Sequence, residues 1–198
     1  MSRGSYINIE KGEKEITINQ LEVIAEYFGV GLTGFLEDRE AKKKKYEQML
    51  FMFLRKIGGD GKIPKTKLAK LLYLADFSWF YENYESMSGM EYRKIAHGPV
   101  PDDYFVLLEE LDGKGKINIQ AKRGALLISE TRVGEKVGSD LLSTEEKKKI
   151  EKVVRRWKNK TTKEIVDFTH SQVPYTFVDY GEVIPYKLIT QEDPEHVV

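Results

Sequence analysis

The sequence predicts a mainly α-helical protein of the α+β class that contains one β-hairpin. Several segments repeat apolar residues at the three- and four-residue spacing of a helix face. Three of them follow a Ser or Thr that has Glu or Gln three residues later, which is a signal for a helix start. One stretch, residues 116–130, changes to two β-rich runs around a short turn. With 40% hydrophobic residues, the chain is able to bury a sizeable core.

The first predicted elements form an N-terminal module at residues 1–38. A helix is expected over residues 17–30, TINQLEVIAEYFGV, with Thr17 and Gln20 as a capping box and Gly29 at its end. A short helical piece follows. Residues 39–46 are mostly charged, and we interpret them as a linker that merges into the next helix. The C-terminal domain then covers residues 47–198.

Four elements are predicted in the first half of the C-terminal domain. One helix starts near residue 46 and stops at Gly58 and Gly59. The next has Pro64 at a first helical position and a broad apolar face, so we expect it at the centre of the core. A third begins after residue 101, with Asp102 and Asp103 near its positive end. The hairpin at 116–130 follows.

Two further helices and an aromatic tail complete the predicted domain. Ser143 and Thr161 each begin a helix, with Glu146 and Glu164 completing the capping boxes. The last stretch is rich in aromatic residues and is interrupted by proline. We expect it to be extended or a short helix, and its final residues to fray.

Composition excludes several kinds of chemistry. The chain has no cysteine, which rules out disulfides, thiolate metal sites and a cysteine nucleophile. No apolar run approaches the roughly 18 residues of a membrane span, and the start lacks a signal core, so we expect a cytoplasmic protein without a membrane partner. The three histidines are isolated, and no P-loop, GxGxxG or GxSxG occurs. We therefore expect no catalytic, cofactor-binding or metal-binding residues and no enzyme activity.

The charges are unevenly distributed although the net charge is zero. Residues 1–41 carry four basic and eight acidic side chains, a local net of −4. Residues 143–160 have a net charge of +5, and residues 161–198 one of −5. The basic helix and the acidic tail either complement each other or mark two partner surfaces.

The N-terminal module resembles the second half of a Cro/repressor-type helix-turn-helix domain. Residues 2–12, SRGSYINIEKG, match the end of a recognition helix, and residues 17–38 match the two helices after it, with Val30 among the matching positions. The first two helices of the family are absent. Because a helix needs its apolar face buried, this module is expected to pack on the C-terminal domain or on a second chain, as in a homodimer.

The helix-turn-helix resemblance also implies contacts with operator DNA. The residues that would make them are Arg3, Ser5, Asn8 and Lys11. The local charge of −4 opposes binding to phosphates, so a packing or dimerisation element is the preferred interpretation.

From Tyr46 onward the chain resembles the SocA-like antitoxin domain, also called the Panacea domain. The resemblance rests on four motifs in the expected order: KLAKLLYLADFSWFY at 67–81, HGPV at 97–100, IVDFTHSQVPY at 165–175 and YGEVIPYKL at 180–188. Tyr175 stands where tryptophan is common in the family. Structural roles are expected for Lys67, Leu71, Leu72, Tyr73, Asp76, His97, Gly98, Pro99 and His170.

His97 is one of three histidines and stands next to Gly98, between a basic run and two prolines. Gly98 permits close approach of the backbone, and Pro99 and Pro101 stiffen the chain after it. We interpret His97 as an architectural residue whose ring packs and donates a hydrogen bond, with partner contact and catalysis as alternatives. His170 is expected on the same surface.

The resemblance implies an antitoxin that binds a cognate protein toxin directly and regulates its own operon. The alternatives are a transcription regulator whose hairpin acts as a wing, and an adaptor that delivers a toxin to a protease. Arg155 and Arg156 on the basic helix are the preferred partner-binding residues, for an acidic partner. Tyr175 and Tyr180 in the aromatic tail are the other candidates.

Overall fold

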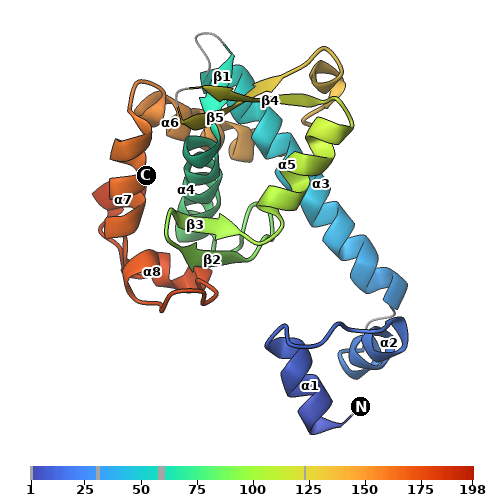
Figure 1. The fold of residues 1–198 in the computed structure, drawn as a ribbon. Coiled ribbons are helices and arrows are strands. Elements are labelled where there is room, and N and C mark those ends of the chain that lie inside the picture. Colours follow the sequence, from blue (N-terminus) through green and yellow to red (C-terminus); the bar gives the residue numbers. More distant parts are fainter. Residues whose placement is uncertain (1, 30–31, 58–60, 123) are drawn as a thin grey trace. The chain divides into compact units, whose positions relative to one another are not determined.

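The computed structural model describes residues 2–29, 32–57, 61–122 and 124–198 (Figure 1). These residues form a mainly helical structure with small antiparallel sheets, which confirms the α+β class. The chain divides into two compact units, Met1–Lys43 and Lys44–Val198. The domain limits expected from the sequence stay a prediction.

The N-terminal unit contains α1 (Arg3–Glu10), α2 (Ile18–Tyr27) and the start of α3 (Leu32–Ile57). The Thr17 side chain accepts the Gln20 amide, and the reciprocal bond is present, which confirms the capping box. Ala25 is the one buried residue of α1 and α2. Large apolar side chains of the described part of this unit are exposed at Tyr6, Ile7, Ile16, Ile18, Val23, Tyr27, Phe28 and Leu36.

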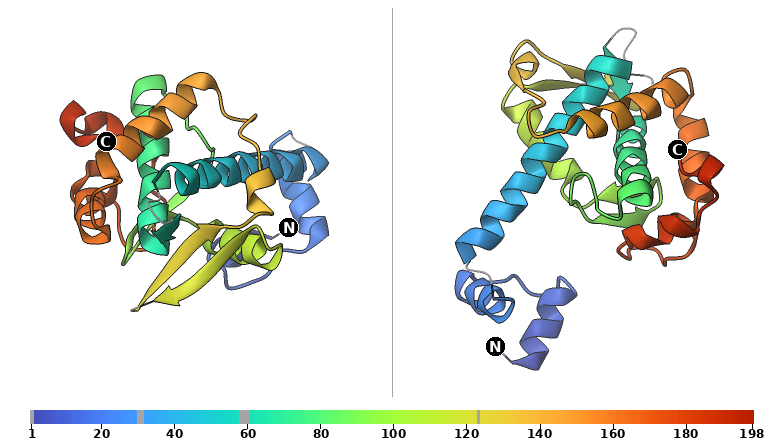
Figure 2. Two further views of the ribbon diagram at one scale, coloured as in Figure 1. Left: turned by 90° about the horizontal axis from the view of Figure 1, so that it is seen from above. Right: turned by 180° about the vertical axis from the view of Figure 1, so that it is seen from behind.

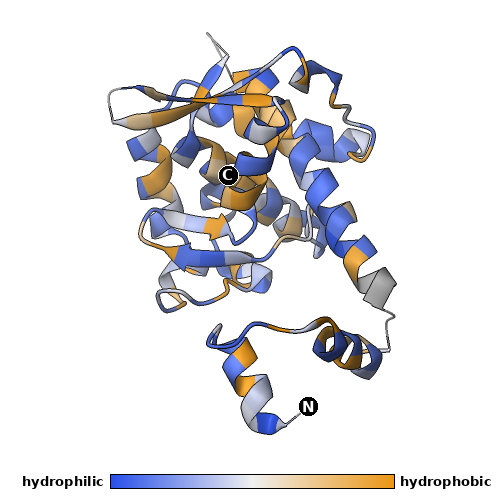
Figure 3. Cartoon of the chain, turned by 45° about the vertical axis from the view of Figure 1, so that its right-hand side comes forward, coloured by the Kyte–Doolittle hydropathy of each residue, from blue (hydrophilic) through white to orange (hydrophobic). Residues whose placement is uncertain are grey.

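Helix α3 runs without a break through the charged residues 39–46. The segment that we interpreted as a linker is therefore helical. Lys, Glu and Ala are strong helix formers, and Lys42 forms an ion pair of 2.6 Å with Asp38 one turn earlier. Figure 3 shows the hydrophilic character of this stretch. The expected helix end at Gly58 and Gly59, like Val30, lies outside the described residues.

Helix α4 (Lys65–Asn83) is the centre of the larger unit, as the sequence predicts. All residues from Lys67 to Ser78 are buried, so this helix is covered on every side. Figures 1 and 2 show α4 in the middle of the unit, between α5 (Tyr104–Gly113) and α7 (Thr162–Ser171). Pro64 is the last residue of strand β1 and the N-cap of α4, one position before the place expected for it.

The predicted hairpin is present and carries a third strand. Strands β4 (Ile117–Lys122) and β5 (Ala125–Glu130) pair in antiparallel register, and Arg123 lies outside the described residues. Strand β1 (Lys62–Pro64) adds to the other edge of β5. A second hairpin, β2 (Tyr92–Ile95) with β3 (Gly98–Pro101), was not expected.

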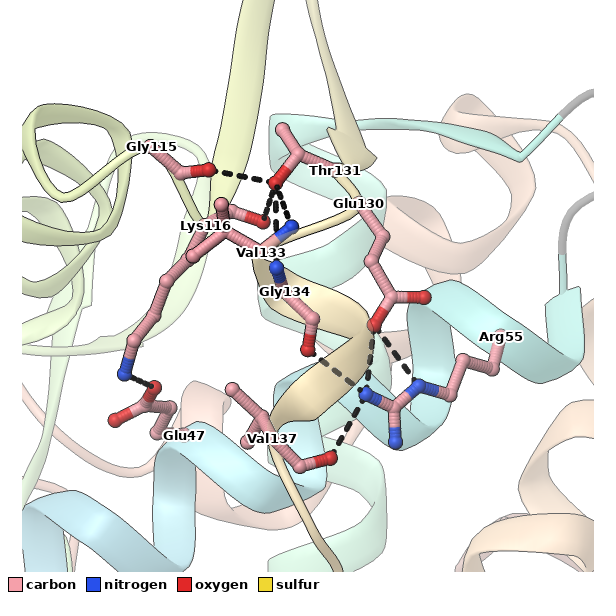
Figure 4. A network of polar contacts seen from close by, with 9 residues as sticks. All are labelled: Glu47, Arg55, Gly115, Lys116, Glu130, Thr131, Val133, Gly134 and Val137. Atoms are coloured by element: carbon pink, nitrogen blue, oxygen red, sulfur yellow. Dashed lines mark hydrogen bonds and ion pairs between the residues drawn. The ribbon is translucent and has the colours of Figure 1, made fainter.

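Arg55 joins α3 to the end of this sheet (Figure 4). Its guanidinium donates to Glu130 at 2.7 and 2.9 Å and to the carbonyls of Gly134 and Val137 at 3.1 and 2.9 Å. The Thr131 hydroxyl accepts the amide of Gly134 at 3.2 Å and so holds the turn into η1 (Gly134–Lys136). One arginine, Arg55, thus fixes the sheet and the following loop on α3.

The C-terminal part contains α6 (Thr144–Trp157), α7, α8 (Val173–Thr176), η2 (Tyr186–Gln191) and η3 (Pro194–His196). Both capping boxes expected for α6 and α7 are present.

The expectation of frayed final residues is wrong. Val197 and Val198 are each only 5% exposed. The Gln172 amide donates to the carbonyls of His196 and Val197 at 2.7 and 3.1 Å. Glu192 also pairs with the His196 imidazole at 2.9 Å. These contacts hold the last residues against the core.

Candidate functional site

The hairpin β2–β3 is the point where segments far apart in the sequence meet. Helices α4 and α7 both pack against β3. On the other side, residues 181–184 run along β2: the amides of Gly181 and Ile184 donate to the carbonyls of Lys94 and Tyr92, at 2.8 and 2.7 Å. The Lys94 amide returns a bond to Glu182 at 3.0 Å. All four motifs therefore converge on this hairpin.

Lys70 of α4 lies under the hairpin and is fully buried. Its Nζ donates to the carbonyl of Pro99 at 2.8 Å. No carboxylate among the described residues pairs with it. Burial lowers the pKa of Lys70 to about 7, because loss of water disfavours the ammonium form.

Because of the lowered pKa of Lys70, the free energy of unfolding should increase as the pH rises above 7. The pKa of Lys70 is about 7 in the folded state and 10.5 in the unfolded chain, so the unfolded chain binds more protons between these values. At about 1.4 kcal/mol per pKa unit, the gain by pH 9.5 is about 3 kcal/mol. Urea unfolding between pH 7 and 9.5 should show this rise in the natural protein and a much smaller one in Lys70→Met, to which Lys67, whose pKa burial also lowers, contributes.

The control for this pH profile is Lys187→Met, which removes an exposed lysine and should keep the full rise. The pH window of the experiment ends below 10, because burial raises the pKa of Tyr73 and Tyr92 well above 10. At higher pH these two tyrosines would also change the free energy of unfolding. An equal rise in Lys70→Met and the natural protein would contradict the prediction.

Gly98 lets the hairpin close on two basic side chains. Its φ is +95°, and a Cβ at this position would lie 2.7 Å from Lys70 Cε and 2.9 Å from His170 Nε2. Only glycine fits this approach without a shift of its neighbours. The close approach expected at Gly98 is thus present.

His170 and His97 meet at the turn of the hairpin, but in different roles. The His170 ring stacks on Tyr175 with the ring centres 4.3 Å apart, and the backbone of His97 lies beside it. Burial first, and then the charge of Lys70, lower the pKa of His170. The Nε2 atom of His170 is buried without a hydrogen-bond partner among the described residues.

The His97 side chain is exposed, so the expectation that its ring packs is wrong. The pairing of Ile95 with Gly98 leaves residues 96 and 97 as a two-residue loop. The tip of such a loop points to solvent, and only the backbone of His97 takes part in the contact with His170.

Asp76 connects α4 to the start of the hairpin. Its carboxylate is fully buried and accepts the Ser88 amide at 2.7 Å and the Tyr92 hydroxyl at 2.8 Å. Burial raises the pKa of Asp76 to about 6, although these hydrogen bonds oppose the rise. Lys67 has a similar anchoring role, since its Nζ donates to the carbonyl of Lys160. The other motif residues with expected structural roles in α4, Leu71, Leu72 and Tyr73, are buried in the core.

Residues 177–180, here called the aromatic segment, expose two large rings beside the hairpin. Phe177 and Tyr180 are each 71% exposed. Tyr175 differs from them: its hydroxyl donates to the Ile95 carbonyl at 3.0 Å, and Lys94 Nζ lies 4.7 Å from its ring centre. Of the two predicted tyrosines, Tyr175 therefore belongs to the scaffold and Tyr180 to the surface. Phe177 completes the pair of exposed rings.

The two arginines predicted to bind a partner lie on α6 in different settings. Arg155 is exposed at a cleft with Trp79, Lys148 and Lys152. The Arg156 guanidinium lies 5.0 Å from the Phe168 ring centre and donates to the Glu195 carbonyl at 3.2 Å. Arg156 is thus used in packing the C-terminal segment.

The predicted DNA-contacting residues lie on or next to α1. Arg3, Asn8 and Lys11 are exposed. Ser5 is half-buried, and its hydroxyl accepts Lys14 Nζ at 3.0 Å. DNA contact and the helix-turn-helix resemblance stay predictions.

A protein-family model described as antitoxin SocA-like, Panacea domain, matches residues 68–174. This match spans more than half of the chain and includes Lys70, Asp76, Gly98 and His170. The chain belongs to the SocA-like Panacea domain family. The family supports an antitoxin-type, regulatory role for the protein. No curated protein and no solved structure matches the chain.

The Panacea match lies inside the larger unit and ends one residue before Tyr175. The aromatic segment therefore begins three residues after the end of the matched region. Across the described parts of the chain, no helix is long and apolar enough to cross a membrane.

Proposed function

We propose that this protein is an antitoxin that neutralises a cognate protein toxin by direct contact through the aromatic segment. The observation that carries the proposal is the exposure of Phe177 and Tyr180, each at 71%, on a firmly held segment that follows the matched Panacea region. Binding energy in protein interfaces is concentrated in a few aromatic or Arg side chains. Two exposed rings three residues apart in the sequence fit that requirement.

The backbone on which these rings stand is fixed at both ends. Lys94 Nζ donates to the Val178 carbonyl at 2.8 Å, and the Gly181 amide donates to the Lys94 carbonyl at 2.8 Å. A preorganised segment loses little conformational entropy when a partner binds. Asp179 and Glu182 are exposed beside the rings, so the toxin surface around them is expected to carry basic residues.

Phe177→Ala and Tyr180→Ala should each weaken binding to the toxin encoded by the adjacent gene by about 30-fold or more. This factor corresponds to about 2 kcal/mol, the usual threshold of an interface hot spot. The melting temperature should hardly change, because both rings are exposed. Titration calorimetry with the purified toxin, and survival of cells that express it, measure the two effects.

Leu126→Ala is the matched control, since Leu126 is an exposed apolar residue of β5, at 43%. It should bind the toxin like the natural protein. Arg155→Glu tests the basic helix in the same assay. If Arg155→Glu abolishes binding while both aromatic variants keep it, the interface lies on α6 and the assignment to the aromatic segment is wrong.

Two further functions extend the antitoxin role that the family implies. They are autoregulation through operator DNA and delivery of a toxin to a protease. For DNA, α1 offers the exposed Arg3 and Asn8, and Lys11 directly follows it. The local charge of −4 over residues 1–41 works against binding to phosphates. Toxin binding is therefore the function that the side chains support best.

A further inference from the structure

A cleft of about 190 Å³ opens between α4, the hairpin β2–β3 and α5. Lys65 and Lys70 give its lining a positive character, His97 adds an imidazole, and Thr66 adds a hydroxyl. Tyr104 and Phe105 are among its apolar walls. None of the described residues that line it is a carboxylate. The volume suits a small organic group, since one water molecule takes about 30 Å³ in the liquid.

Lys70 has more hydrogen-bond donors than acceptors around it. An ammonium group has three N–H donors, and among the described residues only the Pro99 carbonyl accepts one of them, at 2.8 Å. A buried cation without an anion is costly, whereas one that gains an anion is stabilised. His170 Nε2 has no hydrogen-bond partner among the described residues, and it lies 2.9 Å from a Cβ built at Gly98, the same distance as Lys70 Nζ.

We propose that this cleft binds a carboxylate carried on a small apolar or aromatic group. The carboxylate pairs with Lys70, one of the residues that line the cleft, and the Thr66 hydroxyl supplies a second donor. The apolar part packs on Tyr104 and Phe105. Lys65, whose Nζ lies 4.5 Å from the Phe105 ring centre, adds positive charge at the wall.

This chemistry has two sources: a free carboxylic acid, or the end of a protein chain. The second source rests on the proposed function, because the chain end would belong to the bound toxin. Benzoate represents the free acid, and N-acetylphenylalanine represents a chain end. The probe that binds with the lower dissociation constant identifies the source. Binding of either probe supports the site, and this test needs no toxin.

The test is a titration of the full-length protein, followed by NMR of labelled lysine side chains. Benzoate should shift the Lys70 signals in a saturable way, and benzamide, which has the same shape without the charge, should not. Because the ammonium form is required, the apparent dissociation constant should rise about tenfold per pH unit above pH 7.

Two variants separate loss of the site from loss of the fold. Lys70→Met should abolish binding, with its fold checked by circular dichroism and melting temperature. Lys65→Met changes a half-buried wall residue outside the core and should weaken binding several-fold. Lys187→Met should have no effect. The proposal is overturned if neither acid gives a saturable shift at tens of millimolar, if benzamide binds equally, or if folded Lys70→Met or Lys65→Met binds like the natural protein.

Discussion

Replacing Gly98 with alanine should lower the free energy of unfolding by about 2–5 kcal/mol. Two costs combine at this position. The φ of +95° is strained for any residue with a Cβ, and the new methyl group would meet Lys70 and His170 at less than 3 Å. Lys70 cannot easily move aside, because it is fully buried and bonded to Pro99. Urea denaturation gives the free energy directly.

Gly181→Ala is the matched control for Gly98→Ala. Gly181 has a similar φ of +86°, but a Cβ there meets nothing within 4 Å. This variant should therefore show only the backbone cost, about 1–2 kcal/mol. The difference between the two variants measures the close approach of the hairpin to α4. Equal losses would mean that Lys70 and His170 adjust freely and that the packing at Gly98 is loose.

Leu72→Ala should destabilise the protein by about 2–5 kcal/mol, as truncation of a buried leucine leaves a cavity. Leu72 is 0% exposed in α4, the helix covered on all sides. Leu141→Ala, at a leucine that is 44% exposed, should cost far less in the same urea experiment. A loss below about 0.5 kcal/mol for Leu72→Ala would show that α4 is not the centre of the core.

Local signals were sufficient to predict most helices. The capping boxes at Thr17, Ser143 and Thr161 depend on residues three positions apart, and all three are present. The hairpin at 116–130 also depends on neighbouring residues. The central position of α4 followed from its wide apolar face, because a helix that is apolar on most sides needs cover on most sides.

Elements that depend on distant partners were missed. Strand β1 has only three residues and forms because β5 offers a free edge. Strand β3 contains Pro99 and Pro101, which argue against a strand in any local analysis. Among the described strands β3 pairs with β2 alone, so its other edge needs no N–H donor for strand pairing. The charged part of α3 was interpreted as a linker because it lacks an apolar face, although its residues favour a helix.

The candidate site was predictable in part. The motifs indicated that His97, Gly98 and His170 share a surface, and the structure brings them together. Nothing in the sequence distinguished the buried Lys70 from the many exposed lysines, because its burial depends on Gly98, almost 30 residues away. The different exposures of Tyr175 and Tyr180 likewise depend on contacts with the hairpin, which was not itself predicted.

The contact of residues 181–184 with β2 has a consequence for synthesis of the chain. Arg93 pairs with Val183, so the ribosome must add the intervening residues before this edge of β2 is covered. At about 5–20 residues per second, this takes on the order of 5–20 s. During that time the nascent hairpin presents an open strand edge, which other chains are able to pair with. Chaperone protection of the nascent chain is therefore most useful between the emergence of Ile95 and that of Val183.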